Sequence, residues 1–214
     1  MSEREFTKKL YELILREKEM GKHGWLRQVH KNKNLSTEEF QNIWSEWWKG
    51  KLPPKTEVDI ILIFEDPIEV LDKALIGCVE IEYFSIKDIV KKNFYEGLQQ
   101  ALAFSIFGFD GLSLWHIFSP EIEENIIENY ANTMGEIISS FRLPIFYLAA
   151  KILDEKELRM KCFKPSQLEE KGIEYFIDWL NRYWIEKENR NPLLNDNEIK
   201  NRRKILKMLL KIPV

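Results

Sequence analysis

Two hydrophobic segments that contain carboxylates constrain the fold of this chain more than any other feature. They are TEVDIILIFED at residues 56–66 and IGCVEIEYF at residues 76–84, and both have the length and the β-branched composition of buried strands. Asp59, Glu80 and Glu82 lie within them. An ionised carboxylate is costly to bury unless it is paired or binds a metal. Three carboxylates on adjacent strands therefore predict a bound cation.

The connection between these two segments, residues 66–73, is short enough for an antiparallel hairpin. If the faces of the two strands match, Asp59 and Glu80 approach across the ladder to about 5 Å between their Cβ atoms. Two carboxylates at this separation repel each other, and a divalent cation between them would remove that repulsion.

The chain beyond the hairpin alternates between helical and strand patterns. Residues 87–107 predict a helix. A strand, a second helix and two further strands are expected at 111–118, 122–140, 144–153 and 158–163. This alternation predicts an α/β fold with a central mixed β-sheet flanked by helices.

The N-terminal part of the chain adds a helix beside this sheet. Residues 3–20 predict an amphipathic helix, and Glu17 falls on its apolar face. Glu17 has two interpretations: it reaches solvent at the end of the helix, or it leans over the carboxylates of the two strands. Residues 21–32 are interpreted as a loop, and Ser36 begins a Trp-rich helix with a capping-box pattern.

The composition changes after residue 164, and the chain is divided there into an α/β core, 1–164, and a helical segment, 165–214. Residues 167–190 predict an amphipathic helix, and residues 198–212 predict a basic one. We expect this appended segment to pack on the core or to form the contact of a dimer. Direct contact with nucleic acid is the alternative for its basic helix.

Charge and composition exclude some classes of protein. The formal net charge is −3, which argues against non-specific coating of nucleic acid, because such binding uses many Lys and Arg contacts to phosphate. Basic residues nevertheless gather at 49–55, 87–92 and 200–211, so a local basic face is compatible with the sequence.

Cysteine usage and hydropathy give expectations about the compartment. Cys78 and Cys162 lie far apart and form no disulfide framework or zinc spacing, so we expect two buried thiols in a reducing compartment. The sequence has no signal-peptide core and no apolar run of about 18 residues, the length of a membrane helix. We therefore expect a cytoplasmic protein without a membrane partner.

Three short segments give the chain a resemblance to a known family. They are Val58-Asp59-Ile60, Val79-Glu80-Ile81-Glu82-Tyr83 and Tyr95-Glu96-Gly97-Leu98-Gln99-Gln100-Ala101-Leu102, and a strand at 112–118 follows them. In this order they resemble the PD-(D/E)XK nuclease superfamily, which includes restriction-endonuclease-like and Holliday-junction-resolvase-like proteins. The resemblance covers roughly residues 3–118 and implies a PD-(D/E)XK-like core.

The resemblance also implies roles for particular residues. Asp59 and Glu80 would bind Mg²⁺ or Mn²⁺, ions that prefer hard carboxylate oxygens. Gln100 would be the glutamine of the family's helix, with Gln99 as the alternative, and Glu17 would be the acid of the first helix. A bound metal polarises a phosphodiester and lowers the pKa of an attacking water.

The chain departs from the family pattern at position 82, where Glu82 replaces the usual lysine. Three interpretations are open. Glu82 is a further metal ligand; or the cation comes from the predicted helix at 87–107, with Lys92 first and Lys87 or Lys91 behind it; or the site is damaged and the protein only binds DNA.

Taken together, these features predict a metal-dependent deoxyribonuclease that acts as a homodimer in DNA repair, recombination or replication, in a prokaryotic cell or a virus-infected host cell. The alternative is an inactive DNA-binding or assembly protein that retains the nuclease fold. A purely structural interaction protein, organised by the Trp-rich and C-terminal helices, is the third hypothesis.

Overall fold

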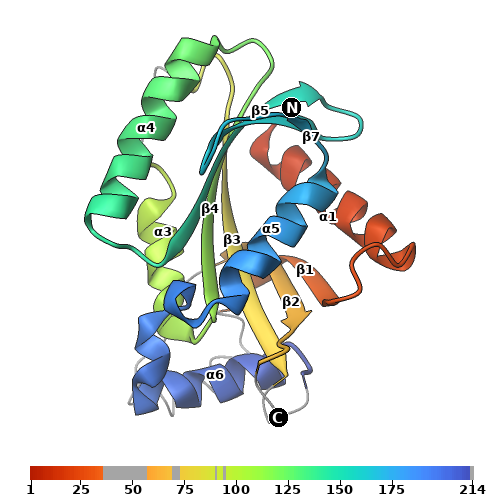
Figure 1. Cartoon of the computed structure of the whole chain (residues 1–214), viewed down its shortest axis with the longest axis vertical. Helices are drawn as coiled ribbons and strands as arrows, with labels where there is room; N and C mark the ends of the chain where they lie inside the picture. Colours follow the sequence, from red (N-terminus) through yellow and green to blue (C-terminus); the bar gives the residue numbers. More distant parts are fainter. Residues whose placement is uncertain (36–56, 69–72, 90, 94, 213–214) are drawn as a thin grey trace.

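The computed structural model describes residues 1–35, 57–68, 73–89, 91–93 and 95–212. Its centre is one seven-stranded sheet in which the strands lie side by side in chain order (Figure 1). The strands are β1 Leu26–Asn34, β2 Glu57–Glu65, β3 Ala74–Phe84, β4 Gly111–Phe118, β5 Ile145–Asp154, β6 Arg159–Lys164 and β7 Leu168–Lys171.

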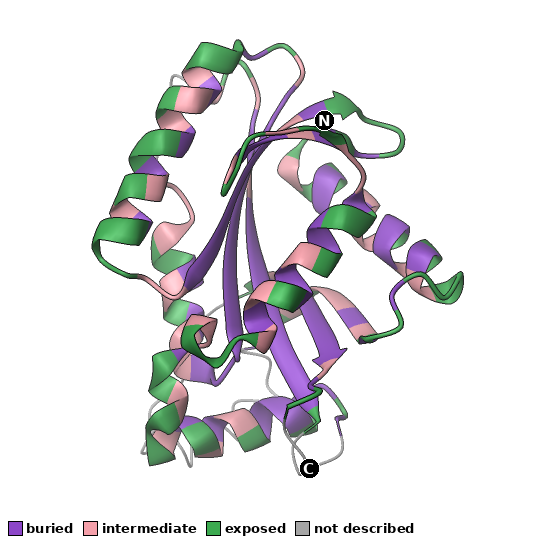
Figure 2. Cartoon of the chain, in the orientation of Figure 1, coloured by how far each residue is buried: buried purple, intermediate pink, exposed green. Residues whose placement is uncertain are grey.

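The sheet is mixed, which confirms the α/β class. Strands β3, β4 and β5 are parallel to one another, and every other pairing is antiparallel. The predicted hairpin of β2 and β3 is confirmed, with Ile60 opposite Val79. Every residue of β4 is buried, as expected of a central parallel strand that is covered on both faces (Figure 2).

Helices cover both faces of the sheet. The α-helices of the described chain are α1 Glu3–Glu19, α3 Leu98–Ala103, α4 Glu124–Ser140, α5 Ile173–Ile185 and α6 Asn197–Leu209. Short 3₁₀ helices are η1 Phe104–Phe107, η2 Lys187–Asn189 and η3 Pro192–Asn195. Apolar side chains of α3, α4 and α6 share one core, and those of α1 and α5 share the other. No helix of the described residues is long and apolar enough to cross a membrane.

The N-terminal helix forms as predicted, but the segment after it does not. Ser2 caps α1, and Glu5 completes a capping box, which fixes where the helix begins. The loop expected at 21–32 is wrong from Leu26 onward, because Leu26–Asn34 is strand β1. This strand has one sheet partner, and much of it is polar and partly exposed, so the hydrophobic alternation that signals a strand is weak.

The single helix predicted over 87–107 is also wrong in its first half. Residues 86–89 and 95–97 form turns, and α3 begins only at Leu98. The break lies at Gly97, whose φ of +74° is left-handed and favours glycine. Val90 and Phe94 of this expected helix lie outside the described residues, as does the Trp-rich helix expected from Ser36.

Residues 165–214 contribute to the sheet and to both cores. The helix expected over 167–190 is corrected, since Leu168–Lys171 is strand β7 and α5 begins at Ile173. Trp184 of α5 is fully buried against two strand glycines. A Cβ atom on Gly77 would lie 2.1 Å from Trp184, and one on Gly111 would lie 2.3 Å from it. These glycines therefore form the space that the indole fills.

The two cysteines are buried and unpaired, as expected. Burial raises the pKa of Cys78, and it raises the pKa of Cys162 to about 12. Both thiols therefore remain protonated at neutral pH and serve as small apolar side chains.

Candidate functional site

The carboxylates of Asp59 and Glu80 lie where the pairing of β2 with β3 ends. The last paired residues are Ile60 and Val79. Beyond them, β3 donates a backbone hydrogen bond to the Asp59 side chain. Its Oδ2 accepts the Ile81 N–H at 2.9 Å. Glu80 is buried, and its Oε2 accepts a hydrogen bond from Gln100. The hairpin therefore brings together the two carboxylates that the sequence assigns to a metal.

Burial and the charges of neighbouring carboxylates perturb both carboxyl groups strongly. Desolvation, with the charges of nearby carboxylates, raises the pKa of Asp59 to about 7. Desolvation and the charge of Asp59 raise the pKa of Glu80 to about 10, although the Gln100 hydrogen bond opposes the shift. Neither group has an ion-pair partner in the described part of the chain. Both are acids that a nearby cation would ionise.

Gln100 is the helix glutamine that reaches this pair. Its Nε2 donates to Glu80 Oε2 at 3.1 Å and to the Glu57 carbonyl oxygen at 3.1 Å. It therefore links α3 to both β2 and β3. Gln99, the alternative from the sequence, makes no hydrogen bond to either carboxylate in the described structure.

Lys92 places its ammonium beside the position where the family pattern has lysine. Its Nζ donates to Glu82 Oε2 at 2.6 Å and to Glu3 Oε2 at 3.1 Å. Burial alone would lower the pKa of Lys92, but the hydrogen bond and charge of Glu82, together with Glu3, raise it. Among the candidate lysines, Lys92 is the one that contacts Glu82, whereas Lys87 and Lys91 are exposed in their turns.

Two side chains, those of Tyr130 and His116, contact the backbone of the segment that carries Lys92. The Tyr130 hydroxyl of α4 donates to the carbonyl oxygens of Ile89 at 2.8 Å and Lys92 at 3.3 Å. His116 of β4 lies 3.0 Å from the Glu96 carbonyl oxygen through Nε2, and its Nδ1 lies 3.1 Å from the Tyr147 hydroxyl. Complete burial lowers the pKa of His116 to about 4, so the ring is neutral and donates to Glu96.

Glu17, expected as the acid of the first helix, is not at this site. Its Oε2 lies 3.0 Å from His23 Nε2, and His23 Nδ1 lies 3.0 Å from Asp178 Oδ1. Glu3 is the α1 acid at the site, where it contacts Lys92. At 1.5 Å per helical residue the two glutamates are about 21 Å apart along α1. Glu17 can lie on the apolar face of α1 because His23 contacts its carboxylate there.

Sequence reasoning missed Glu3 as a site residue. It would have been found only if the sequence showed which end of α1 lies beside the carboxylates. Glu3 lies in the first turn, where an acid is also explained by the positive end of the helix dipole. Its Oε2 accepts the Tyr83 N–H at 3.3 Å. Because that contact spans 80 positions in the sequence, local patterns do not reveal it.

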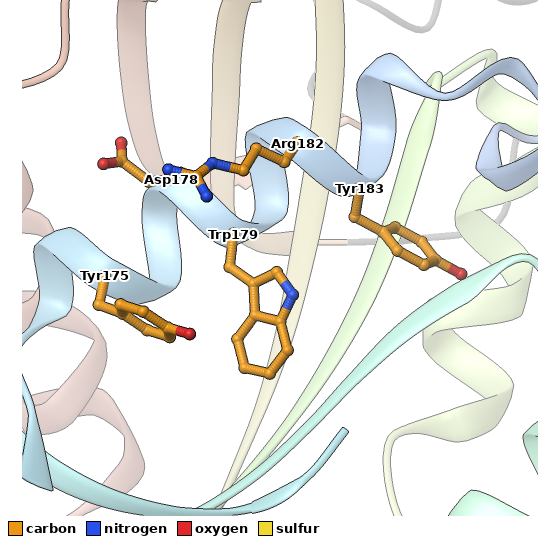
Figure 3. Close-up of a pocket in the computed structure, with 5 residues that line it drawn as sticks. All are labelled: Tyr175, Asp178, Trp179, Arg182 and Tyr183. Carbon is orange, nitrogen blue, oxygen red and sulfur yellow. The ribbon is translucent and has the colours of Figure 1, made fainter. Parts of the chain in front are cut away.

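A cavity of about 650 Å³ opens beside Asp59. It lies between α1 and the ends of β1 and β2, and its lining residues are Glu3, Arg4, Thr7, Lys31, Asn32, Glu57 and Asp59. A different cavity, of about 360 Å³, lies over the outer side of α5, where aromatic rings border an arginine and an aspartate (Figure 3). None of the candidate site residues lines that second cavity.

Comparisons with protein-family models, with curated proteins and with solved structures give no match to this chain. The described residues also contain no group of three or more His, Cys, Asp and Glu side chains placed to hold a metal ion. Asp59 and Glu80 nevertheless fit a divalent cation of the magnesium type, which is commonly held by one or two carboxylates and several waters. The function is therefore inferred from the chemistry of this pair and its neighbours.

Proposed function

We propose that this chain is a metal-dependent nuclease of the PD-(D/E)XK type that hydrolyses DNA phosphodiester bonds. The observation that carries the proposal is the pair Asp59 and Glu80: a half-buried and a buried carboxyl group at the end of one hairpin pairing, neither with an ion-pair partner among the described residues. Neighbouring carboxyl groups with strongly raised pKa values are more frequent at functional sites, because a stable fold alone does not require them. Mg²⁺ or Mn²⁺ would be held by these two residues.

Residues around the pair have separable roles in this proposal. When bound, the metal would polarise the phosphodiester and lower the pKa of a water. Gln100 orients the Glu80 carboxylate through its 3.1 Å hydrogen bond. The backbone N–H of Ile81 fixes one oxygen of Asp59 and leaves the other available. Water attacks phosphorus as the ester P–O bond breaks; the attacking water gives up a proton to solvent, and the leaving oxygen takes one from solvent.

Lys92 supplies the ammonium that position 82 lacks. An ammonium group has three donors, and Glu82 and Glu3 accept from two of them. The third can donate to the attacking water or to a phosphate oxygen. Because the two glutamates raise its pKa, Lys92 remains protonated at neutral pH and acts as a donor, not as a base. In this arrangement Glu82 positions Lys92.

The proposal is tested by cleavage of end-labelled DNA. Single-stranded, duplex, flap and four-way junction substrates are incubated with Mg²⁺, Mn²⁺ or EDTA, and the native chain is compared with Asp59→Asn and Glu80→Gln. We expect metal-dependent cutting by the native chain alone. Glu12→Gln, on an exposed face of α1, is the matched control and should cut normally. Cutting that survives either site substitution would overturn the proposal.

The second candidate function is an inactive DNA-binding or assembly protein with the same fold. The observation that favours it is the pairing of Lys92 with two glutamates, which neutralises the only described ammonium within hydrogen-bond distance of Glu82. This alternative predicts DNA binding that is equal in Mg²⁺ and EDTA and unchanged by Asp59→Asn. A role in repair, recombination or replication, and a homodimeric state, stay predictions of the nuclease proposal.

A further inference from the structure

We propose that the cavity between α1 and β1 binds a backbone phosphate of the substrate strand, through Arg4 and Lys31, next to the phosphate that reacts at Asp59. The inference rests on the proposed function and adds a substrate-binding subsite to it. Arg4 comes from the first turn of α1, and Lys31 comes from the middle of β1. They are positioning residues for substrate, because neither is placed at the reacting atoms.

The size and position of the cavity suit one nucleic-acid strand. Its volume of about 650 Å³ is that of a site for a small molecule, enough for one or two nucleotides but not for a duplex. Asp59 belongs both to the cavity lining and to the candidate metal pair. A strand whose scissile phosphate lies at Asp59 would therefore place a neighbouring phosphate in the cavity.

The cavity is lined by two cationic side chains, Arg4 and Lys31, and by three acidic ones, Glu3, Glu57 and Asp59. Glu3 is engaged by Lys92, and Glu57 accepts a hydrogen bond from Asn32 at 2.8 Å. Arg4 is exposed and has no ion-pair partner among the residues that the structure describes. Lys31 Nζ lies 4.8 Å from the centre of the Tyr11 ring, and within the described chain it has no carboxylate partner. Two cationic groups therefore remain available to a ligand.

Thr7 provides an independent indication that the cavity has a polar ligand. Its side chain lines the cavity, it is 1% exposed, and its Oγ1 has no hydrogen-bond partner in the described part of the chain. A threonine inside a helix usually bonds the carbonyl oxygen three or four residues before it. An unsatisfied buried hydroxyl is costly, and a phosphate oxygen in the cavity would accept a hydrogen bond from it. Arg, Lys and Thr are common phosphate contacts in protein–DNA complexes.

The test is a binding measurement that does not depend on cleavage. A fluorescein-labelled single-stranded oligothymidine of twelve nucleotides is titrated with protein in EDTA, by fluorescence anisotropy, at 50 to 200 mM salt. Arg4→Gln and Lys31→Gln should each reduce the slope of log affinity against log salt by about 0.7, the value for one lost contact to a single strand. Thr7→Val should weaken binding about fivefold without changing the slope, because it removes one uncharged hydrogen bond.

Lys18→Gln is the matched control, since it removes a positive charge from the other end of α1, about 21 Å from Arg4. It should retain the native slope, and thermal unfolding of each variant checks the fold. Native slopes in both Arg4→Gln and Lys31→Gln, or no binding by the native chain, would overturn the subsite. The outcome is separable from the nuclease proposal. If Arg4→Gln and Lys31→Gln reduce the slope but the native chain never cuts DNA, the subsite stands and the nuclease proposal does not. If Asp59→Asn loses cutting but Arg4→Gln and Lys31→Gln keep the native slope, the nuclease proposal stands and the subsite does not.

Discussion

The Nζ atom of Lys92 lies 2.6 Å from Oε2 of Glu82, so the residue that departs from the family pattern contacts a lysine from the following segment. The same ammonium contacts Glu3 at 3.1 Å. A strand, a turn segment and the first turn of α1 therefore meet at one positive charge. This relationship places a cation beside position 82, where the family that the sequence resembles has lysine.

The Lys92–Glu82 pair predicts the effect of exchanging its charges. Glu82→Lys should lower DNA cleavage at least tenfold, because two ammonium groups would then repel each other and displace Lys92. The double variant Glu82→Lys with Lys92→Glu should recover part of the loss, because the opposite charges are restored in exchanged positions. Single-turnover cleavage rates measure both effects. If Glu82→Lys alone raises the rate, Glu82 does not position Lys92.

Metal binding should appear as stability that depends on Asp59 and Glu80. Mg²⁺ at ten to one hundred times its dissociation constant is expected to add about 1 to 3 kcal/mol to the free energy of unfolding of the native chain. Asp59→Asn and Glu80→Gln should lose this gain. They should fold normally without metal, because burial already favours the neutral forms of these acids. Thermal unfolding with Mg²⁺ and with EDTA measures the difference, and an equal gain in both variants would contradict it.

Gly97 should be intolerant of a side chain. Its φ is +74°, and a Cβ atom there would lie 2.8 Å from Glu82 Cγ and 2.8 Å from Leu114 Cδ1. We expect Gly97→Ala to reduce the free energy of unfolding by about 1 to 3 kcal/mol, as strained backbone positions do. Cleavage should fall as well, because Glu82 would have to move. Gly24→Ala, where a Cβ atom meets nothing within 4 Å, is the control and should be neutral in urea unfolding.

His116 predicts a loss of stability in mild acid. Its pKa is about 4 in the folded chain, against about 6.5 for an ordinary histidine, so the unfolded chain binds more protons between these values. The contribution of His116 to the free energy of unfolding is therefore complete above about pH 6.5 and decreases as the pH falls. From pH 7 to pH 5 the contribution should drop by about 2 kcal/mol. His116→Asn should remove this part of the slope. An identical pH dependence in the two proteins, measured by urea unfolding, would contradict the assignment.

The elements with a strong hydrophobic pattern could be predicted from the sequence. Strands β2, β3, β4 and β5 are mainly apolar, and α4 has a clear helical period. The pairing of β2 with β3 followed from the short connection. For the same reason the proximity of Asp59 and Glu80 could be predicted from the sequence alone.

Where local patterns were weak or ambiguous, the predictions were wrong. β1 is polar because it has one sheet partner, and the lysines in it hide its apolar positions. Glu17 was predicted because it falls on the apolar face of α1, yet the site lies at the other end of that helix, at Glu3. The break at Gly97 depends on contacts with Glu82 and Leu114, and such long-range contacts are not visible in a local pattern. Lys92 was the first of three candidate lysines, with Lys87 and Lys91 behind it. Its contact with Glu82 could not be worked out from the sequence, because the turn that carries Lys92 was predicted as helix.

The indole of Trp184, which fills the space over Gly77 and Gly111, has a consequence for the order of events during synthesis. The apolar surface of β3 and β4 at these glycines is completed by a residue that leaves the ribosome more than 70 positions after Gly111. At 5 to 20 residues per second this interval lasts about 4 to 15 seconds. During this interval the apolar surface at Gly77 and Gly111 has no indole to cover it.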